Sequence, residues 1–307
     1  MGKIDIALNR YFGNEECADF INAVSYNGER VIKPEDFVEK DPVLAHMYEV
    51  NGETDGSKRE RDFFRMVLVN NTYYIFIGVE HQSIEDPIMP LRIVEYDVIA
   101  YRKQYDEWEK VRDEDNKKGI KTEPFILKPV MTYVIYWSDK KWSKPKSLKE
   151  LMDEDVIANL ENTPFGDMIL DYKMTVYSPA DSDKFEGFKT NLGKIFTFIR
   201  YQKYYKLLTA AFEKEQFDLR QEEVDVINMV TGSDFKIKEG EVKLSMCDAL
   251  RDIREEGRSE GRNEGRLEEL LSSIKMLIKN LEMTPDQAMD TLQVPQEKRS
   301  LLMKGLG

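Results

Sequence analysis

The stretch RDFFRMVLVNNTYYIFIGVEHQ, residues 61–82, decides the fold of this chain. Two segments in it, Phe63–Val69 and Tyr73–Val79, are rich in the β-branched and aromatic residues that favour strands. Between them lie Asn70 and Asn71, and asparagine tolerates the left-handed backbone of tight turns. The pattern predicts an antiparallel hairpin closed by a two-residue loop.

The register of this hairpin would bring two acidic side chains together. If Val69 pairs with Thr72, Asp62 lies opposite Val79 and one residue from Glu80. The two carboxylates are 18 positions apart in sequence, and they would meet at the same end of the hairpin.

Gln82 adds a third polar group at this end. It lies two residues beyond Glu80, so both side chains point to the same side of the strand. Carboxylate and amide oxygens suit a hard divalent cation, Mg²⁺ or Mn²⁺. The alternative is a surface hairpin in which Asp62 pairs with Arg59 or Arg61 and Glu80 is merely solvated.

These residues fall into a longer pattern. It consists of Asp62, Glu80-x-Gln82, Met89-Pro90-x-Arg92 and Tyr96-Asp97. The pattern resembles the recombination-promoting nuclease family, also described as putative transposases with a YhgA-like domain, of the PD-(D/E)XK phosphodiesterase superfamily. Further matching runs are Asn22, Val31–Asp36 (VIKPED), Trp142–Leu148 (WSKPKSL) and Ser245–Asp248 (SMCD). The resemblance covers most of the chain.

The resemblance implies an α/β fold with a restriction-endonuclease-like core, in which a mixed sheet is flanked by helices. It implies a Mg²⁺-dependent DNA endonuclease that promotes recombination or serves mobile elements. Asp62 and Glu80 would hold the metal, and Gln82 would orient the attacking water or a metal-bound one. The superfamily's usual lysine is Gln82 here; glutamine is also usual in this family, but an amide neither acts as a base nor carries charge. The rival interpretation is a non-catalytic binding or oligomerisation protein that keeps the fold.

Length and composition limit the class of protein. The 307 residues fit one large domain or two, and we expect a nuclease-like domain over residues 1–215 and a helical region over 216–307. No apolar run reaches the roughly 20 residues that span a bilayer, and the first residues lack the apolar segment of a signal peptide. Two cysteines 230 positions apart favour a reduced, cytoplasmic setting, and with two histidines they nearly exclude a zinc site.

The net charge of −13 argues against broad attraction to nucleic acid, but two segments are basic. Residues 140–149 hold five lysines around Trp142, and residues 184–206, predicted to be helical, hold six Lys/Arg against one Glu. Lysines beside an aromatic residue suit a nucleic-acid backbone, although a solvated loop would have the same composition. The predicted DNA contacts of the loop are Lys140, Lys141, Lys144 and Lys146.

Two helices are predicted around the hairpin, over Asn14–Val24 and Leu91–Arg112. Arg92 falls in the first turn of the second helix. It could grip a scissile phosphate, or it could neutralise Glu95 and Asp97 on its own helix. In the superfamily the first helix often supplies one more acid to the metal. The candidates are Glu15, Glu16 and Asp19, which would equally complement the positive end of their helix.

The run REEGRSEGRNEGR, residues 254–266, repeats Glu-Gly-Arg every four residues. On a helix the repeat forms separate stripes of Glu, Gly and Arg, and each interior glycine costs roughly 1 kcal/mol relative to alanine. The segment is therefore either a flexible linker or a surface that lets another helix approach closely. We predict one helix over Arg254–Leu281 that joins two copies of the chain, against the alternative of a frayed connector.

Overall fold

The computed structural model describes residues 3–38, 62–182, 185–212 and 217–306. The chain divides into two compact units, of which the first ends at Leu244 and the second begins at Ser245. The sequence placed this boundary near residue 215. The first unit extends further because α7 (Gln221–Thr231) packs against α1 (Lys3–Tyr11), where Arg10 and Glu222 form a 3.4 Å ion pair.

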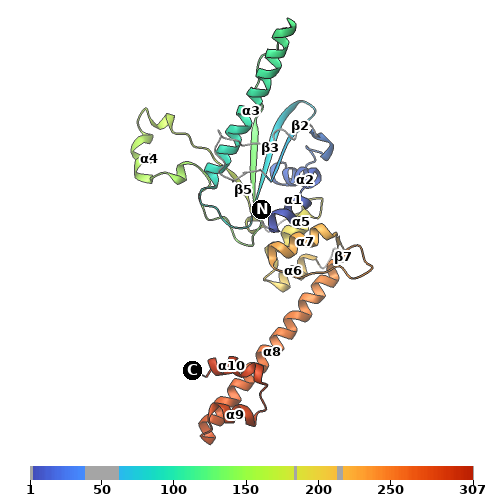
Figure 1. Cartoon of the computed structure of the whole chain (residues 1–307), viewed down its shortest axis with the longest axis vertical. Helices are drawn as coiled ribbons and strands as arrows, with labels where there is room; N and C mark the ends of the chain where they lie inside the picture. Colours follow the sequence, from blue (N-terminus) through green and yellow to red (C-terminus); the bar gives the residue numbers. More distant parts are fainter. Residues whose placement is uncertain (1–2, 39–61, 183–184, 213–216, 307) are drawn as a thin grey trace. The chain divides into compact units, whose positions relative to one another are not determined.

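The first unit is built on a mixed five-stranded sheet (Figure 1) with the order β1-β2-β3-β4-β5. Neighbours pair antiparallel from β1 to β3 and parallel from β3 to β5. A parallel step needs a crossover, and α3 provides it between β3 and β4. The predicted fold class, an α/β core with a mixed sheet flanked by helices, is therefore confirmed. The strands are β1 (Phe37–Val38), β2 (Phe63–Val69), β3 (Tyr73–Gln82), β4 (Val130–Tyr136) and β5 (Thr175–Tyr177).

The hairpin of β2 and β3 is present, but the predicted register was wrong by one residue. Val69 pairs with Tyr73 rather than with Thr72, so the loop holds three residues. Asn70 and Asn71 both adopt left-handed backbone, with φ of 50° and 52°. The Thr72 amide donates to the Val69 carbonyl oxygen at 3.0 Å and closes the turn.

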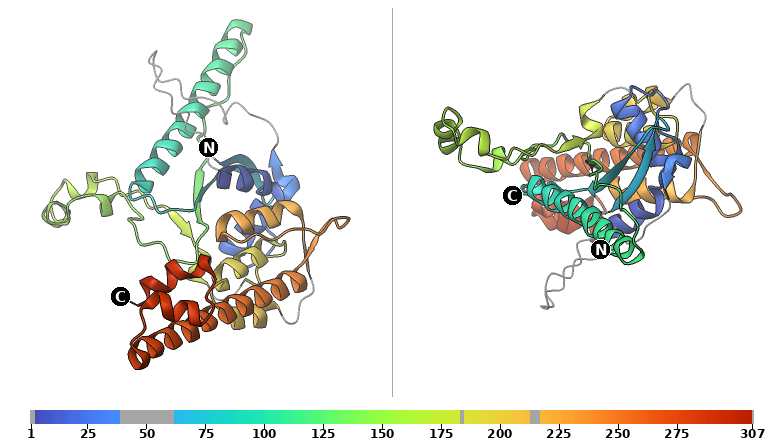
Figure 2. Two further views of the ribbon diagram at one scale, coloured as in Figure 1. Left: turned by 60° about the horizontal axis from the view of Figure 1, so that its bottom comes forward. Right: turned by 90° about the horizontal axis from the view of Figure 1, so that it is seen from above.

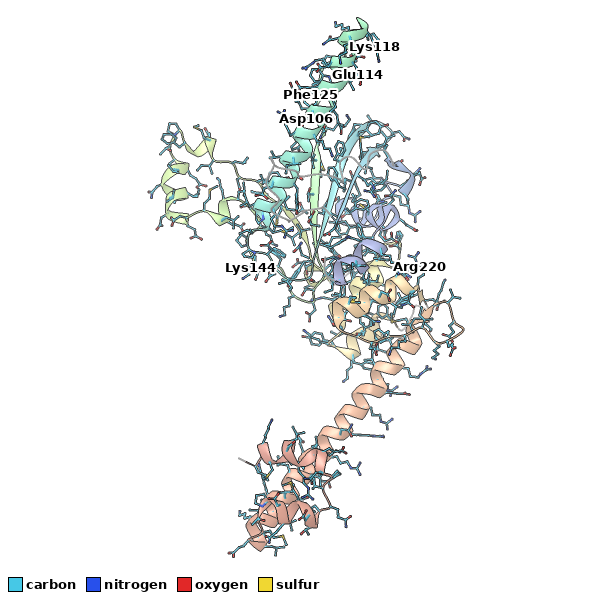
Figure 3. All side chains as sticks on the ribbon, in the orientation of Figure 1. Asp106, Glu114, Lys118, Phe125, Lys144 and Arg220 are labelled. Atoms are coloured by element: carbon cyan, nitrogen blue, oxygen red, sulfur yellow. The ribbon has the colours of Figure 1, made fainter. Side chains whose placement is uncertain are left out.

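Helix α3 (Met89–Lys118) covers one face of the sheet (Figure 2). Proline lies in its first turn, and Gly119 ends it with a left-handed φ of 68°. It is longer at both ends than the predicted Leu91–Arg112, and Glu114 and Lys118 lie on the part that runs past the strands (Figure 3). The buried side chains between α3 and this face include Met89, Ile93, Tyr96, Val134 and Tyr136.

Helices α2 (Asn14–Ser25) and α5 (Leu192–Tyr201), and Phe12 between α1 and α2, supply aromatic side chains to the other face. Phe12 meets Phe63 edge-on with ring centres 5.7 Å apart, and Phe20 meets Tyr133 in the same way at 5.5 Å. Phe196 of α5 packs on Trp137 at 5.1 Å. The sheet is thus a central layer with helices on both sides.

One helix was predicted over residues 184–206, but its described residues, 185–206, form a loop, α5 and the start of α6 (Tyr205–Phe212). The remaining elements of the first unit are α4 (Glu154–Glu161), β6 (Asp218–Leu219) and 3₁₀ turns at Pro34–Asp36, Lys149–Leu151, Gly166–Met168 and Pro179–Asp181. A short strand β7 (Leu244–Ser245) pairs with β6.

The second unit consists of α8 (Met246–Leu281), α9 (Pro285–Thr291) and α10 (Gln296–Lys304). Its core contains Ile274, Ala288, Met289, Val294 and Leu302. The prediction of one continuous helix over residues 254–281 is confirmed, and α8 starts eight residues earlier. Within the described residues, no helix combines the length and apolar character needed to cross a membrane.

Candidate functional site

Asp62 lies just before β2, where the carboxyl end of β3 passes beside it. The ladder ends with Phe63 opposite Val79, so Asp62 and Glu80 are the next residues beyond the last pair. Side chains of directly opposed residues project from the same face of a sheet. The predicted register would have opposed Asp62 to Val79 and sent Glu80 to the other face. The observed register therefore keeps both carboxylates at the same end of the hairpin.

The Asp62 carboxylate is held by the backbone of the neighbouring strand. Its Oδ2 accepts a hydrogen bond from the His81 amide at 2.7 Å. Burial raises the pKa of Asp62 to about 6, because the charged form loses hydration. The His81 amide, the charge of Arg92 and a hydrogen bond from Asn9 oppose this shift, whereas the charge of Asp5 adds to it. A cation beside Asp62 would offset the cost of its ionisation.

Glu80 is deeply buried, with 2 % of its surface exposed, because β3 lies between β2 and β4 in the sheet. The charge of Glu80 acts on Arg92 of α3. Burial lowers the pKa of Arg92, but a hydrogen bond to Asp86 and interactions with Tyr96 and Glu80 raise it to a net value above the usual one. Arg92 thus carries a fixed positive charge near both candidate metal ligands.

The alternatives for Arg92 are partly resolved by its contacts. Its Nη1 donates to Asp86 Oδ2 at 2.8 Å. Asp97, the proposed partner on the same helix, instead accepts hydrogen bonds from Thr132, at 2.7 Å, and from the Tyr172 hydroxyl. The Arg92 side chain keeps 25 % of its surface exposed, so a phosphate contact stays a prediction.

Gln82 ends β3 and is half-buried, and alternation along the strand gives it the same face as Glu80. His81 between them is buried, and its Nδ1 accepts a hydrogen bond from Trp137 Nε1 at 3.0 Å. Burial lowers the pKa of His81 to about 3, so this ring is neutral. His81 therefore packs in the core, and Gln82 is the polar side chain on the same face as Glu80.

The predicted lysine loop lies at the same end of the sheet. Ser143 binds Glu85, which follows β3 by three residues, through its amide and through its hydroxyl, the latter at 3.0 Å. Lys140, Lys141, Lys144 and Lys146 are all exposed (Lys144 is labelled in Figure 3). Trp142, expected beside DNA, is 5 % exposed and packs edge-on against Tyr136 at 5.3 Å, so it belongs to the core.

The second predicted basic segment, residues 184–206, approaches the lysine loop in space. Lys203, after α5, forms a 2.5 Å ion pair with Asp139, which precedes the lysine loop. Lys141 approaches Asp181 at 3.9 Å, and the Lys140 carbonyl oxygen accepts from the Ser178 hydroxyl at 2.9 Å. Two lysine-rich segments that are far apart in the sequence thus adjoin within one unit.

The three acids of α2 that were candidate metal ligands either have other hydrogen-bond partners or line a different cavity. Asp19 accepts three hydrogen bonds from Lys189 and Thr190, at 2.6–2.9 Å. Glu16 accepts from the Gly13 amide at 3.1 Å and approaches Arg220 at 3.5 Å. Glu15 lines a small cavity between α2 and residues 28–35.

The acid that acts on Asp62 comes from α1, a helix for which no site residue was predicted. Asp5 and Asn9 both affect the pKa of Asp62, and their spacing of four residues places them on one helical face. That spacing was the available signal. Among the described side chains, no group of three or more His, Cys, Asp or Glu residues has metal-binding geometry.

The shifted pKa of Asp62 predicts a pH-dependent stability. The folded state holds this proton up to about pH 6, whereas the unfolded chain loses it near pH 3.8. The stability of the wild type should therefore fall as pH rises through this window. Asp62→Asn, unfolded by urea in EDTA, should gain about 2–3 kcal/mol over the wild type above pH 6, from about 1.4 kcal/mol per pKa unit. Below pH 4 the gain should vanish.

The matched control for this experiment is Asp234→Asn, because the Asp234 side chain is 81 % exposed. Its effect should be small and equal at both pH values. A gain for Asp62→Asn that is the same at pH 4 and pH 7 would contradict the prediction.

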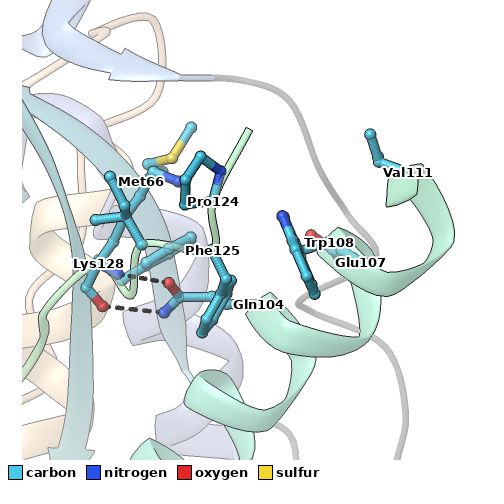
Figure 4. A pocket seen from close by; sticks show the side chains of 10 residues that line it. Met66, Gln104, Glu107, Trp108, Val111, Pro124, Phe125 and Lys128 are labelled. Carbon is cyan, nitrogen blue, oxygen red and sulfur yellow. Dashed lines mark hydrogen bonds between the residues drawn. The ribbon is translucent and has the colours of Figure 1, made fainter. Parts of the chain in front are cut away.

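A cavity of about 410 Å³ lies between α3 and residues 124–128 (Figure 4). The Gln104 amide fixes its floor through two hydrogen bonds to the Lys128 backbone, at 2.8 and 3.1 Å. Trp108 and Phe125 line it, with Trp108 Nε1 bound to the Glu123 carbonyl oxygen at 2.9 Å. Among its described lining residues, none is a candidate site residue, so this cavity is separate from the carboxylates.

Residues 61–177 match the family model described as putative transposase, YhgA-like. That segment is similar to the YhgA-like family. It runs from the hairpin to the end of β5, and it contains Asp62, Glu80, Gln82, Arg92 and the four loop lysines. No curated protein matches the chain, and no solved structure matches it. The description of the YhgA-like family suggests a role of the transposase or nuclease type.

Proposed function

We propose that this protein is a Mg²⁺-dependent DNA endonuclease of the recombination-promoting type. The observation that carries the proposal is that Asp62 and Glu80 come from the same end of the hairpin and that each carboxylate interacts electrostatically with Arg92, with the lysine loop bound to Glu85 nearby. The carboxylates would be the metal ligands, Arg92 and the lysines the DNA contacts. The family match of the same segment supports this interpretation.

The donor set fits a hard divalent cation. Two carboxylates from neighbouring strands present oxygen ligands, and the raised pKa of Asp62 marks a position where ionisation lacks full compensation. Asp5 of α1 adds negative charge near Asp62. We expect the carboxylates of Asp62 and Glu80 to lie within roughly 6 Å of each other when both bind one ion.

Each residue has a distinct role in phosphodiester hydrolysis. A cation bound there would polarise the phosphate and lower the pKa of an attacking water. Gln82, on the face of Glu80, would hold that water through its amide, which orients but cannot take a proton. Arg92 would stabilise the negative charge that develops on the phosphate oxygens.

The test is conversion of supercoiled plasmid to nicked or linear DNA. Cleavage should occur with Mg²⁺ or Mn²⁺ and should stop in EDTA. Absence of cleavage with either metal, together with retained DNA binding, would favour the rival function, a nuclease fold used only for binding. The single observation on the rival's side is Gln82, which cannot act as a base.

DNA should bind through the lysine loop. Changing Lys140, Lys141, Lys144 and Lys146 to glutamine should weaken duplex binding in EDTA, and the slope of log Kd against log salt should fall by about one for each lysine that binds a phosphate in the wild type. Fluorescence anisotropy at several salt concentrations measures both quantities.

The matched control is a second quadruple variant, in which four exposed lysines on or just after the distal part of α3 are changed to glutamine. These are Lys110, Lys117, Lys118 and Lys121. It changes the net charge equally. Equal losses of affinity for both quadruple variants would show that total charge, rather than the loop, governs binding.

A further inference from the structure

A second cavity of about 730 Å³ lies in the first unit, apart from the carboxylates. It is formed by residues 185–190, α5 and α6, and its volume is in the range of small-molecule sites. Its lining residues are Phe185, Glu186, Phe188, Lys189, Thr190, Gly193, Lys194, Thr197, Tyr201, Leu207, Ala210, Ala211 and Phe212.

One wall of this cavity is aromatic and firmly packed. Phe188 meets Phe196 edge-on at 5.4 Å, and Phe185 packs against both at 6.4 Å. Gly193 makes this possible, because a Cβ at that position would lie 2.6 Å from the Phe188 Cβ. The rings of Phe185, Phe188 and Tyr201 are only partly buried, so their remaining surface faces the cavity that they line.

The residues of α6 that line the cavity are Leu207, Ala210, Ala211 and Phe212, three of which are small or aliphatic. Ala210 and Ala211 are exposed, and Leu207 keeps 52 % of its surface exposed. Together with the aromatic rings, these side chains form an apolar part of the cavity, here called the slot. Such a slot suits a flat ring, which gains stacking contacts on one side and van der Waals contacts on the other.

The cavity also carries positive charge. Lys189 is exposed, and its Nζ donates to the Glu186 carbonyl oxygen at 3.3 Å. Lys194 also lines the cavity, and its Nζ lies 4.3 Å from the centre of the Phe217 ring. Glu186 is the acid among the described lining residues, so these give a net charge of +1.

We propose that this cavity binds one unstacked nucleotide of single-stranded DNA. The base would stack on the Phe185, Phe188 and Tyr201 wall, and Lys189 and Lys194 would contact the flanking phosphates. The proposal rests on the proposed function and deepens it, because it gives that nuclease a single-stranded or locally opened substrate. Lys203, through its ion pair with Asp139, connects the end of α5 to the segment just before the lysine loop.

The test measures binding without cleavage, so that it is independent of catalysis. The probe is a fluorescein-labelled thymidine strand of about 12 nucleotides, within the site sizes of single-strand binders, with anisotropy read in EDTA. Ala211→Phe fills the slot from an exposed position and should raise the Kd about tenfold or more. Lys189→Gln with Lys194→Gln should raise the Kd and lower the salt slope by about one or more.

Two controls separate the base from the charge. A strand of the same length with abasic central positions should bind more weakly to the wild type and should be insensitive to Ala211→Phe. Lys206→Gln, an exposed lysine of α6 outside the lining, should leave affinity nearly unchanged. Thermal unfolding of each variant verifies its fold.

An unchanged Kd for Ala211→Phe, or an equal loss with the abasic strand, would overturn the proposal and leave the lysines as backbone contacts. If the wild type does not cleave plasmid DNA with either metal, the proposed function is refuted, whatever the anisotropy measurements show. The two failures are therefore distinguishable.

Discussion

Asp62→Asn should abolish metal-dependent DNA cleavage while the protein remains folded. Asparagine keeps an oxygen that can accept the His81 amide hydrogen, but it removes the negative charge that would bind the cation. We expect the rate of plasmid nicking to fall by at least about a hundredfold, since metal activation contributes several kcal/mol to such reactions. Glu80→Gln should have an effect of similar size.

Asp62→Asn should thus lose cleavage activity and, above pH 6, gain free energy of unfolding, and the combination of both effects identifies the site. A catalytic carboxylate whose burial costs folding free energy should, once neutralised, give a more stable and less active protein. Asp234→Asn, at an exposed position, should change neither property. Cleavage by Asp62→Asn at the wild-type rate would exclude the site. If Asp62→Asn does not fold, Glu80→Gln provides the test of the site instead.

Truncation of the chain after Asp252, which removes most of α8 together with α9 and α10, should leave a monomer. We propose that two copies of α8 associate through residues 254–266, so the full chain should sediment at twice its own mass and a chain ending at Asp252 at its single mass. Equal numbers of chains per particle for both would show that the repeat assembles nothing.

The physical reason lies in the repeat itself. Like charges four residues apart repel along a single helix, whereas antiparallel helices can set the Arg stripe of one against the Glu stripe of the other. A Cβ added at Gly257, Gly261 or Gly265 would meet nothing within 4 Å in the described part of the chain. The chain therefore gives no internal reason for glycine there, and a second helix in close contact would supply one.

This offers a sharper variant than truncation. Changing Gly257, Gly261 and Gly265 to leucine should stabilise α8 as an isolated helix, by somewhat less than about 1 kcal/mol at each position. The bulkier side chains should nevertheless separate the two copies. The repeat drifts by about 40° every four residues, which favours a right-handed crossing. High salt should weaken the charged contact. A dimer that survives the triple substitution would rule out the glycine surface.

The sequence predicted the elements better than it predicted their alignment. The β-branched and aromatic runs and the Pro90 start of α3 are local signals, and the structure contains each element. The register of the hairpin was wrong because two left-handed asparagines fit a three-residue loop as well as a two-residue loop. A one-residue difference decides which side chains share a face.

Features that depend on distant contacts were not accessible in the same way. Nothing near Asp62 in the sequence indicates that Asp5 and Asn9 come beside it, because α1 reaches this strand only through the tertiary fold. Trp142 has the polar neighbours of a surface residue, yet it is buried against Tyr136. The ion pair of Lys203 with Asp139 likewise joins basic segments that the sequence presents as separate.

The two kinds of strand pairing in the sheet also imply an order of folding. β2 and β3 close over a three-residue turn, so their pairing costs little chain entropy and can form in microseconds. β3 meets β4 only after the 30-residue α3 has crossed between them, which is a slower, non-local step. Asp62 and Glu80 would thus already face each other in the nascent hairpin, before α3 and its arginine arrive to balance their charge.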